Sequence, residues 1–230
     1  MIPTTTAFPT IAPFGPSPSP TRAPELQMYN YMGTNIAEST GDGGQAYYAS
    51  LNYPVAIWND EIHGYLYIAE QLGCRIRRVN KLTTIVTTFA GTGQCLTSID
   101  DEYKDDDQTH FATSTSLNQP SGVWGDSSGS TIYVSELAPH RIRVIDVSTN
   151  IIKTIVGTGI AGYSNGDNSN DNENKIQLNS PTYLFVNPIN DNNSNVSLIF
   201  ADSGNHIIRS ISNINNDHNN ENVLIQTIAG

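Results

Sequence analysis

One pattern of residues occurs three times in this chain of 230 residues, and it restricts the fold more than any other feature. Each copy opens on Leu-Asn-x-Pro, which ends at Pro54, Pro120 and Pro181. An acidic residue follows an apolar run at Glu70, Glu136 and Asp202, and an arginine follows it at Arg77, Arg143 and Arg209. Both charged markers recur at intervals of 66 residues. A fixed period of this length indicates a repeat architecture.

Each copy is expected to hold four short β-strands. Runs rich in Val, Ile, Tyr and Thr alternate with Gly, Pro, Asn and Asp, and no window keeps a helical period for three turns. The predicted strands are 54–59, 64–69, 75–80 and 83–90, then 120–125, 130–135, 141–146 and 151–156, then 181–187, 196–201, 206–212 and 223–229. Apolar residues point to both sides of several strands, so both faces of each sheet need cover. Antiparallel meanders stacked face to face around an axis supply it, which predicts an all-β propeller.

These residues resemble the NHL-repeat family of the TolB-like propeller superfamily. The resemblance rests on LN-x-P, G-x-LYIAD, RIR-x-V and TIAGTG, with a preceding GDGG turn at 41–44, and it covers about residues 26–230. It places blades at about 51–93, 117–159 and 178–230. Met32-Gly33-Thr34 aligns with Ala90-Gly91-Thr92, so residues 26–32 are interpreted as the last strand of a preceding blade. The third copy departs from the pattern with IIRSI, and GDGG is degraded near 105–112.

The resemblance implies a ring of six blades, of which this chain holds about three and one stray strand. We therefore expect a fragment of a longer propeller or, as the alternative, two chains that pair to complete a ring. Open blade faces predict self-association. The Pro/Thr/Ser-rich residues 1–25 are expected to form a disordered or semi-extended linker.

The formal net charge of −11 argues against nucleic acid as a partner, because that requires clustered Lys and Arg. No apolar run is long enough to span a membrane, and no secretion signal opens the chain. The compartment stays open, since an extracellular or cell-surface location would follow from a signal missing upstream.

The recurring acid–arginine pairs admit two interpretations. They could form a ring of catalytic or ligand-binding charges. The structural interpretation is favoured: each acidic residue caps the turn between strands two and three through backbone N–H groups, and each arginine pairs locally. We therefore predict no catalytic, cofactor-binding or metal-binding residues and no cofactor.

Other polar groups give weaker signals. The acidic stretches 100–107 and 167–171 could bind calcium through oxygen ligands, but neither completes an EF-hand loop, and a solvated loop is favoured. The five histidines form no metal-binding pattern; they are His63, His110, His140, His206 and His218. Equivalent positions of the first strands hold Trp58, Trp124 and Phe185, which favours core aromatics over a carbohydrate platform.

The two cysteines are predicted to lie on one face. Cys74 falls in a turn between strands two and three, and Cys95 in a connection between blades. A disulfide requires a Cα separation below about 7 Å and an oxidising compartment. In that setting Asn192 and Asn195 are glycosylation acceptors.

The same face receives the long connections 93–117 and 159–178, and repeat proteins often bind through insertions of this kind. The predicted function is a non-enzymatic interaction scaffold that presents acidic loops to a protein or other ligand. The alternative is a propeller hydrolase or lyase with catalytic residues largely in blades outside this chain. The repeated Asn52, Asn118 and Asn179 are interpreted as turn caps rather than ligands.

Overall fold

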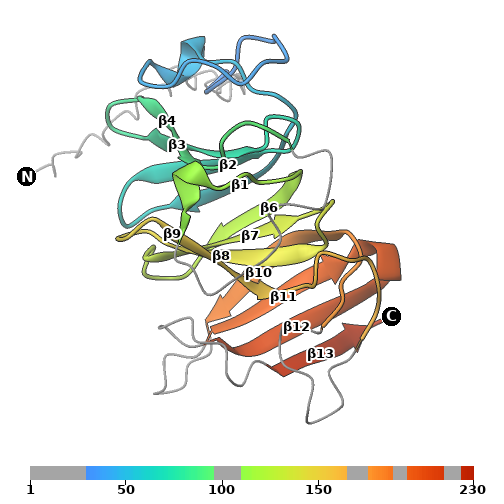
Figure 1. Ribbon diagram of the computed structural model, residues 1–230. Helices are drawn as coiled ribbons and strands as arrows, with labels where there is room; N and C mark the ends of the chain where they lie inside the picture. The colour runs from blue at the N-terminus through green and yellow to red at the C-terminus, as the bar shows by residue number, and fades with distance from the viewer. Residues whose placement is uncertain (1–29, 96–109, 165–175, 189–195, 215–223) are drawn as a thin grey trace, which may run out of the picture.

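The computed structural model describes residues 30–95, 110–164, 176–188, 196–214 and 224–230. It consists of antiparallel sheets that follow one another in chain order, so that the N- and C-terminal parts lie at opposite ends of the stack (Figure 1). The described residues contain short 3-10 helices but no α-helix. The predicted all-β architecture of propeller blades is therefore confirmed.

Each blade is a meander of four strands joined in sequence order. Blade 1 consists of β1 (Pro54–Asp60), β2 (Tyr65–Glu70), β3 (Arg75–Asn80) and β4 (Val86–Ala90). Blade 2 contains β6 (Pro120–Gly125), β7 (Thr131–Glu136), β8 (Arg141–Asp146) and β9 (Ile151–Val156). Blade 3 contains β10 (Pro181–Pro188), β11 (Val196–Asp202), β12 (Ile207–Ile214) and β13 (Leu224–Ala229). All twelve strands lie within a few residues of the predicted positions.

A fifth element on the outer edge of two blades was not predicted. Strand β5 (His110–Phe111) pairs with β9 of blade 2, and Gln45 makes an isolated bridge to Ile85 beside β4. Gln45 is followed by the short 3-10 helix η1 (Ala46–Tyr48), and β5 is followed by η2 (Ala112–Ser114). Such short pairings have no periodicity to reveal them in the sequence. They cover outer edges that would otherwise expose unpaired backbone groups.

Hydrophobic clusters lie between successive blades. One joins blades 1 and 2 and includes Tyr67 and Ile76 from blade 1 and Val123 and Ile145 from blade 2. A second joins blades 2 and 3 through residues such as Tyr133, Ile142, Leu184 and Phe200. A third covers the other face of blade 1 with residues from the segment that precedes it, among them Met32, Ala46 and Leu51. Both faces of blades 1 and 2 thus contribute to a core, as the apolar pattern predicted.

The glycine after β4 and after β9 fixes how each blade ends. Gly91 and Gly157 have φ values of 90° and 107°, a region that favours glycine. A Cβ at either position would come within 2.3 Å of the carbonyl oxygen of Cys74 or His140. Gly33 shares the conformation with φ of 109°, in keeping with the alignment of Met32-Gly33-Thr34. Residues 30–32 are not in a strand; the rest of the predicted strand 26–32 and the linker 1–25 lie outside the described residues.

Candidate functional site

One end of the blades gathers the repeated polar residues, and we call it the Leu-Asn-x-Pro face. It consists of the segments 51–54, 117–120 and 178–181, the turns 71–74, 137–140 and 203–206, and the first residues of the connections between blades, 91–95 and 157–164. Backbone hydrogen bonds join these parts: the Gly73 and Gly204 N–H groups donate to the Asn52 and Asn179 carbonyls at 3.2 and 2.8 Å. The Asn52 side-chain amide also donates to the Leu72 carbonyl at 3.3 Å, which supports its role as a turn cap.

The three acidic residues of the repeat are buried and accept backbone hydrogen bonds. Glu70, Glu136 and Asp202 are 0% exposed. Their carboxylates accept from the N–H groups of Asn52, Asn118 and Asn179 at 2.8, 2.7 and 2.7 Å. These donors belong to the Leu-Asn-x-Pro segments, so the predicted cap on the turn between strands two and three is wrong. Each acid pairs in register with the proline that starts strand one, which explains why its carboxylate meets the entering chain.

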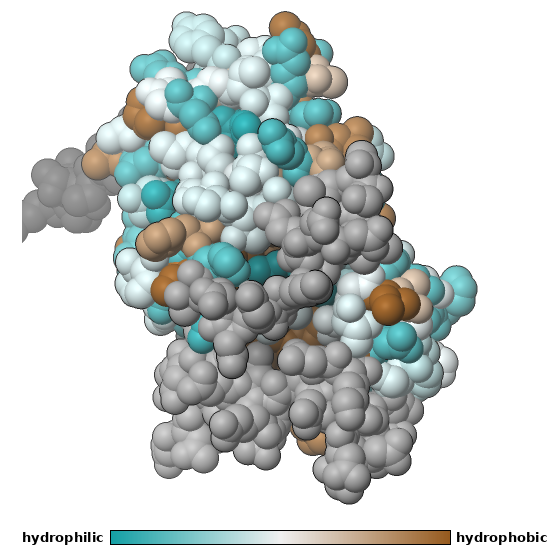
Figure 2. All heavy atoms as spheres, in the orientation of Figure 1, coloured by the Kyte–Doolittle hydropathy of each residue, from teal (hydrophilic) through white to brown (hydrophobic). Residues whose placement is uncertain are grey.

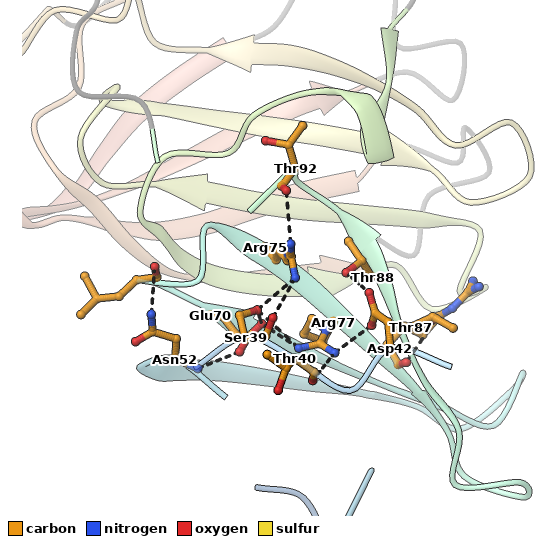
Figure 3. A network of polar contacts seen from close by, with 12 residues as sticks. Ser39, Thr40, Asp42, Asn52, Glu70, Arg75, Arg77, Thr87, Thr88 and Thr92 are labelled. Atoms are coloured by element: carbon orange, nitrogen blue, oxygen red, sulfur yellow. Dashed lines mark hydrogen bonds and ion pairs between the residues drawn. The ribbon is translucent and has the colours of Figure 1, made fainter. Parts of the chain in front are cut away.

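The arginine of blade 1 joins its acid to the GDGG turn (Figure 3). Arg77 is 0% exposed and lies 3.2 Å from the Glu70 carboxylate. Its other terminal nitrogen donates to Asp42 at 2.7 Å and to the Thr40 carbonyl at 3.1 Å. Ser39 donates its hydroxyl to Glu70 at 2.7 Å. A buried charge pair needs such additional hydrogen bonds, because desolvation otherwise outweighs the attraction between the charges.

The other blades vary this arrangement while keeping the acid–arginine pair. Arg209 lies 3.2 Å from Asp202 and donates to the carbonyls of Ser164 and Gln177. In blade 2 the arginine closest to Glu136 is Arg141, whose Nε donates to the carboxylate at 2.7 Å, and Arg143 lies at 3.8 Å. The predicted local pairing of the arginines is confirmed. Because these charges are buried and bonded to the fold, the geometry supports a structural role for them.

A disulfide fixes the start of the first long connection on this face. Cys74 and Cys95 are bonded with a Cα separation of 5.4 Å, which satisfies the distance condition stated from the sequence. Cys74 is fully buried at the end of the β2–β3 turn, whereas Cys95 is exposed. The predicted placement of both cysteines on one face is confirmed. Spacing in the sequence could not decide whether they pair.

The histidines are dispersed. His140 accepts a hydrogen bond at Nδ1 from the Ser180 backbone N–H at 2.9 Å, and burial lowers its pKa although the Asp202 carboxylate opposes this. His63 lies 2.9 Å from Asp60 at the opposite end of blade 1. His110 and His206 are exposed, and His218 lies outside the described residues. In the part of the chain that the structure describes, no group of three or more His, Cys, Asp or Glu side chains could hold a metal ion.

The repeated aromatic residues pack on the core but keep part of their surface free. Trp58 and Trp124 are partly buried against the clusters between blades, and Phe185 is 45% exposed. The expectation that these three residues are core aromatics is therefore only partly met, because each packs on the core and also keeps exposed surface. The acidic stretches 100–107 and 167–171 and the glycosylation acceptors Asn192 and Asn195 lie outside the described residues, so their predicted roles stay predictions.

Comparison with known families shows which family this chain belongs to. Residues 60–218, more than half of the chain, match the family described as the teneurin NHL domain. The chain belongs to the teneurin NHL-domain family. The NHL domain is also 28% identical over 104 residues to the NHL repeat-containing protein 2 of Bos taurus, and 26% identical over 107 residues to that of Homo sapiens. The matches cover 45% and 46% of this chain but only 13% and 14% of those relatives.

Solved structures support the fold of the NHL domain. An auxiliary nutrient binding protein from Bacteroides ovatus superposes with a TM-score of 0.53 at 14% identity, over 79% of this chain and 37% of that protein. One from Bacteroides thetaiotaomicron gives 0.50 at 17% identity, over 76% and 35%. At these identities the likeness concerns the fold alone. None of the helices among the described residues is long and apolar enough to cross a membrane.

Proposed function

We propose that this NHL domain is a non-enzymatic binding module that engages a protein or other ligand through the Leu-Asn-x-Pro face. The observation that carries the proposal is the disulfide between Cys74 and Cys95, which attaches the first long connection to the rigid β2–β3 turn. Binding loops held by a rigid scaffold are the usual arrangement in repeat proteins. Membership of the NHL family also supports a binding role.

The buried charges of this face support a scaffold rather than a reactive centre. Glu70, Glu136 and Asp202 use their carboxylates to hold the chain that enters strand one, and their arginine partners are buried beside them. Side chains committed to the fold in this way are poorly placed to exchange protons with a substrate. Recognition is then left to the connections 93–117 and 159–178, which carry Asp and Glu residues and favour a ligand with positive charge.

The disulfide also bears on the compartment. Stable disulfides form in secreted and cell-surface proteins and are rare in the reducing cytosol. We therefore propose that the domain works outside the cytosol, where it would meet a cell-surface or secreted ligand.

Two shortened variants test the proposed face. Tetramerised domain would be applied to cells and matrix proteins, and binding measured by flow cytometry and surface plasmon resonance. Replacing residues 96–109 by a short Gly/Ser linker should abolish binding, whereas the same replacement of 215–223, between β12 and β13, should preserve it. Binding that survives the first change and is lost with the second would contradict the proposal.

A further inference from the structure

A cavity of about 330 Å³ lies at the end of the blades remote from the Leu-Asn-x-Pro face. The first strands of all three blades line it: β1 with residues 61 and 62, β6 with residues 126, 127 and 129, and β10. This volume is at the lower end of the range for small-ligand sites, so it suits one side chain or a small molecule. The cavity is independent of the face assigned to binding above. We call it the aromatic–acidic pocket.

Aromatic rings form the walls of this pocket. Trp58, Trp124 and Phe185 occupy equivalent positions of the three blades, and the Trp124 and Phe185 rings meet edge to face at 5.1 Å. Trp58 is supported from behind by Tyr67 at 5.5 Å. The Tyr67 ring is fully buried, whereas these three wall residues keep exposed surface. Aromatic faces with free surface attract cations through the negative charge above each ring.

Carboxylates form the rim. Asp60, Glu61 and Asp126 all line the pocket. Asp60 is 2% exposed and accepts the backbone N–H groups of Ile62 and His63 at 3.0 Å, so its position is fixed. Asp126 accepts the Thr131 N–H at 3.2 Å, and Glu61 accepts the Asn59 amide at 2.7 Å.

Two basic residues contact residues of this rim. His63 contacts Asp60 at 2.9 Å, and Lys81 donates to Asn59 at 2.8 Å. The described lining contains these three carboxylates and no lysine or arginine, so acidic groups outnumber basic ones at the pocket itself. Close contact between blades holds this arrangement in place, since a Cβ at Gly129 would lie 2.6 Å from His63 Nδ1.

We propose that the aromatic–acidic pocket binds a guanidinium or ammonium group carried on an apolar stem. The cation would lie against the tryptophan faces with its N–H groups directed at the rim carboxylates, and the stem would fill the apolar part of the pocket. The same chemistry is offered by an arginine or lysine side chain of a protein and by a free organic cation. This site lies apart from the Leu-Asn-x-Pro face, so it can fail without affecting the function proposed there.

The chain contains two tryptophans, and both line this pocket, so intrinsic fluorescence reports on the site directly. The whole chain would be titrated with N-acetyl-arginine methylamide, with its neutral citrulline counterpart, and with tetramethylammonium. A saturable change with the cations but not with citrulline is expected. Tighter binding of the arginine probe indicates a protein side chain as the natural ligand, and tighter binding of tetramethylammonium a free cation. An equal response to citrulline, or no saturable response to any probe, would overturn the proposal.

Matched variants localise the effect. Glu61→Gln removes a rim charge from an exposed residue and should weaken binding of the arginine probe about two- to fivefold. Glu38→Gln removes the same charge from an exposed residue outside the pocket and should leave the affinity unchanged. Equal effects of the two variants would show that net charge alone attracts the probe and would overturn a specific site. Circular dichroism of both variants confirms that the fold is retained.

Discussion

The Nδ1 atom of His140, at the end of the β7–β8 turn, accepts a hydrogen bond of 2.9 Å from the backbone N–H of Ser180, which enters blade 3. The bond ties two successive blades together on the Leu-Asn-x-Pro face. Its geometry requires an unprotonated Nδ1, and burial favours the same neutral form of the ring. The equivalent position in blade 1 is Cys74, which is held to the following connection by the disulfide. Both devices attach one blade to the chain that leads into the next.

Replacing His140 with Ala should destabilise the domain by about 1–2 kcal/mol, because the Ser180 N–H loses its acceptor. His206→Ala is the matched control: its side chain is exposed, and both positions have positive φ, 48° at His140 and 60° at His206. The free energy of unfolding would be measured in urea. Equal losses in the two variants would show that backbone conformation, rather than the hydrogen bond, sets the cost.

The lowered pKa of His140 also predicts a pH dependence. The unfolded chain takes up a proton at this residue near pH 6.5, before the folded chain does, so stability is complete above that value and declines as the pH falls through the lower folded pKa. Urea denaturation between about pH 5 and 8 should show this slope in the wild type and a reduced one in His140→Gln. An unchanged slope in the variant would contradict the assignment.

The buried pair of Glu70 and Arg77 should be essential for stability. Arg77→Met leaves the Glu70 carboxylate buried beside an apolar group and should cost about 3–5 kcal/mol. Arg78→Met, at the neighbouring and partly exposed residue that packs on Tyr65, should cost less. A thermal melt that ranks the two variants in the opposite order would restore the interpretation of the repeated charges as ligand-binding groups.

Loss of the disulfide should destabilise the folded chain by about 3 kcal/mol, since the bond closes a segment with a sequence separation of 21 residues. The variant Cys74→Ala/Cys95→Ser would be compared with the wild type in urea, each with and without a reducing agent. Reduction should lower the stability of the wild type and leave the variant unchanged. Insensitivity of the wild type to complete reduction would count against a structural role for the bond.

The face of blade 3 that points away from blade 2 is expected to mediate self-association. Ile208 and Ile228 are 38% and 55% exposed, whereas their equivalents in blade 2, Ile142 and Ile155, are 0% and 1% exposed against blade 3. The opposite face of blade 1 is covered by residues of its own preceding segment, so we expect the blade 3 faces of two copies to pack on each other.

Light scattering over a dilution series tests this. Ile208→Asp should shift the chain from dimer to monomer. Ile160→Asp is the control, because Ile160 is 61% exposed but lies in the connection after blade 2. A monomeric wild type, or dissociation by both variants alike, would count against the predicted interface.

The sequence predicts the strands of each blade, but not the side-chain contacts that hold the segments entering the blades. Short runs rich in Val, Ile, Tyr and Thr and the period of 66 residues specify strands, because strand geometry is local and repeats with the chain. The bond from Asn52 N–H to Glu70 was assigned to the wrong turn, since it depends on the register of β1 and β2 and on the positive φ of 56° at Tyr53. The contact of Arg77 with Asp42 joins residues 35 apart and could have been suspected only from the GDGG motif.

The surface seen in Figure 2 shows why apolar exposure alone is a poor guide to function. Hydrophobic residues on that side are scattered among hydrophilic ones rather than gathered into one patch. The sequence does not reveal the aromatic–acidic pocket, because its walls come from three blades. In the sequence its tryptophans are also indistinguishable from buried core residues. Only the packing of β1 against β6, and of β6 against β10, brings these side chains together.

The stacking of blades face to face is tested most directly by the contact between Trp58 of blade 1 and Gly125 of blade 2. A Cβ at Gly125 would come within 2.3 Å of the Trp58 ring. Gly125→Ala should therefore destabilise the domain by about 1–3 kcal/mol, and the same substitution should cost little in a Trp58→Ala background. A double-mutant cycle measured in urea should give a coupling of about 1 kcal/mol or more. Strictly additive effects would mean that the two blades do not meet as described.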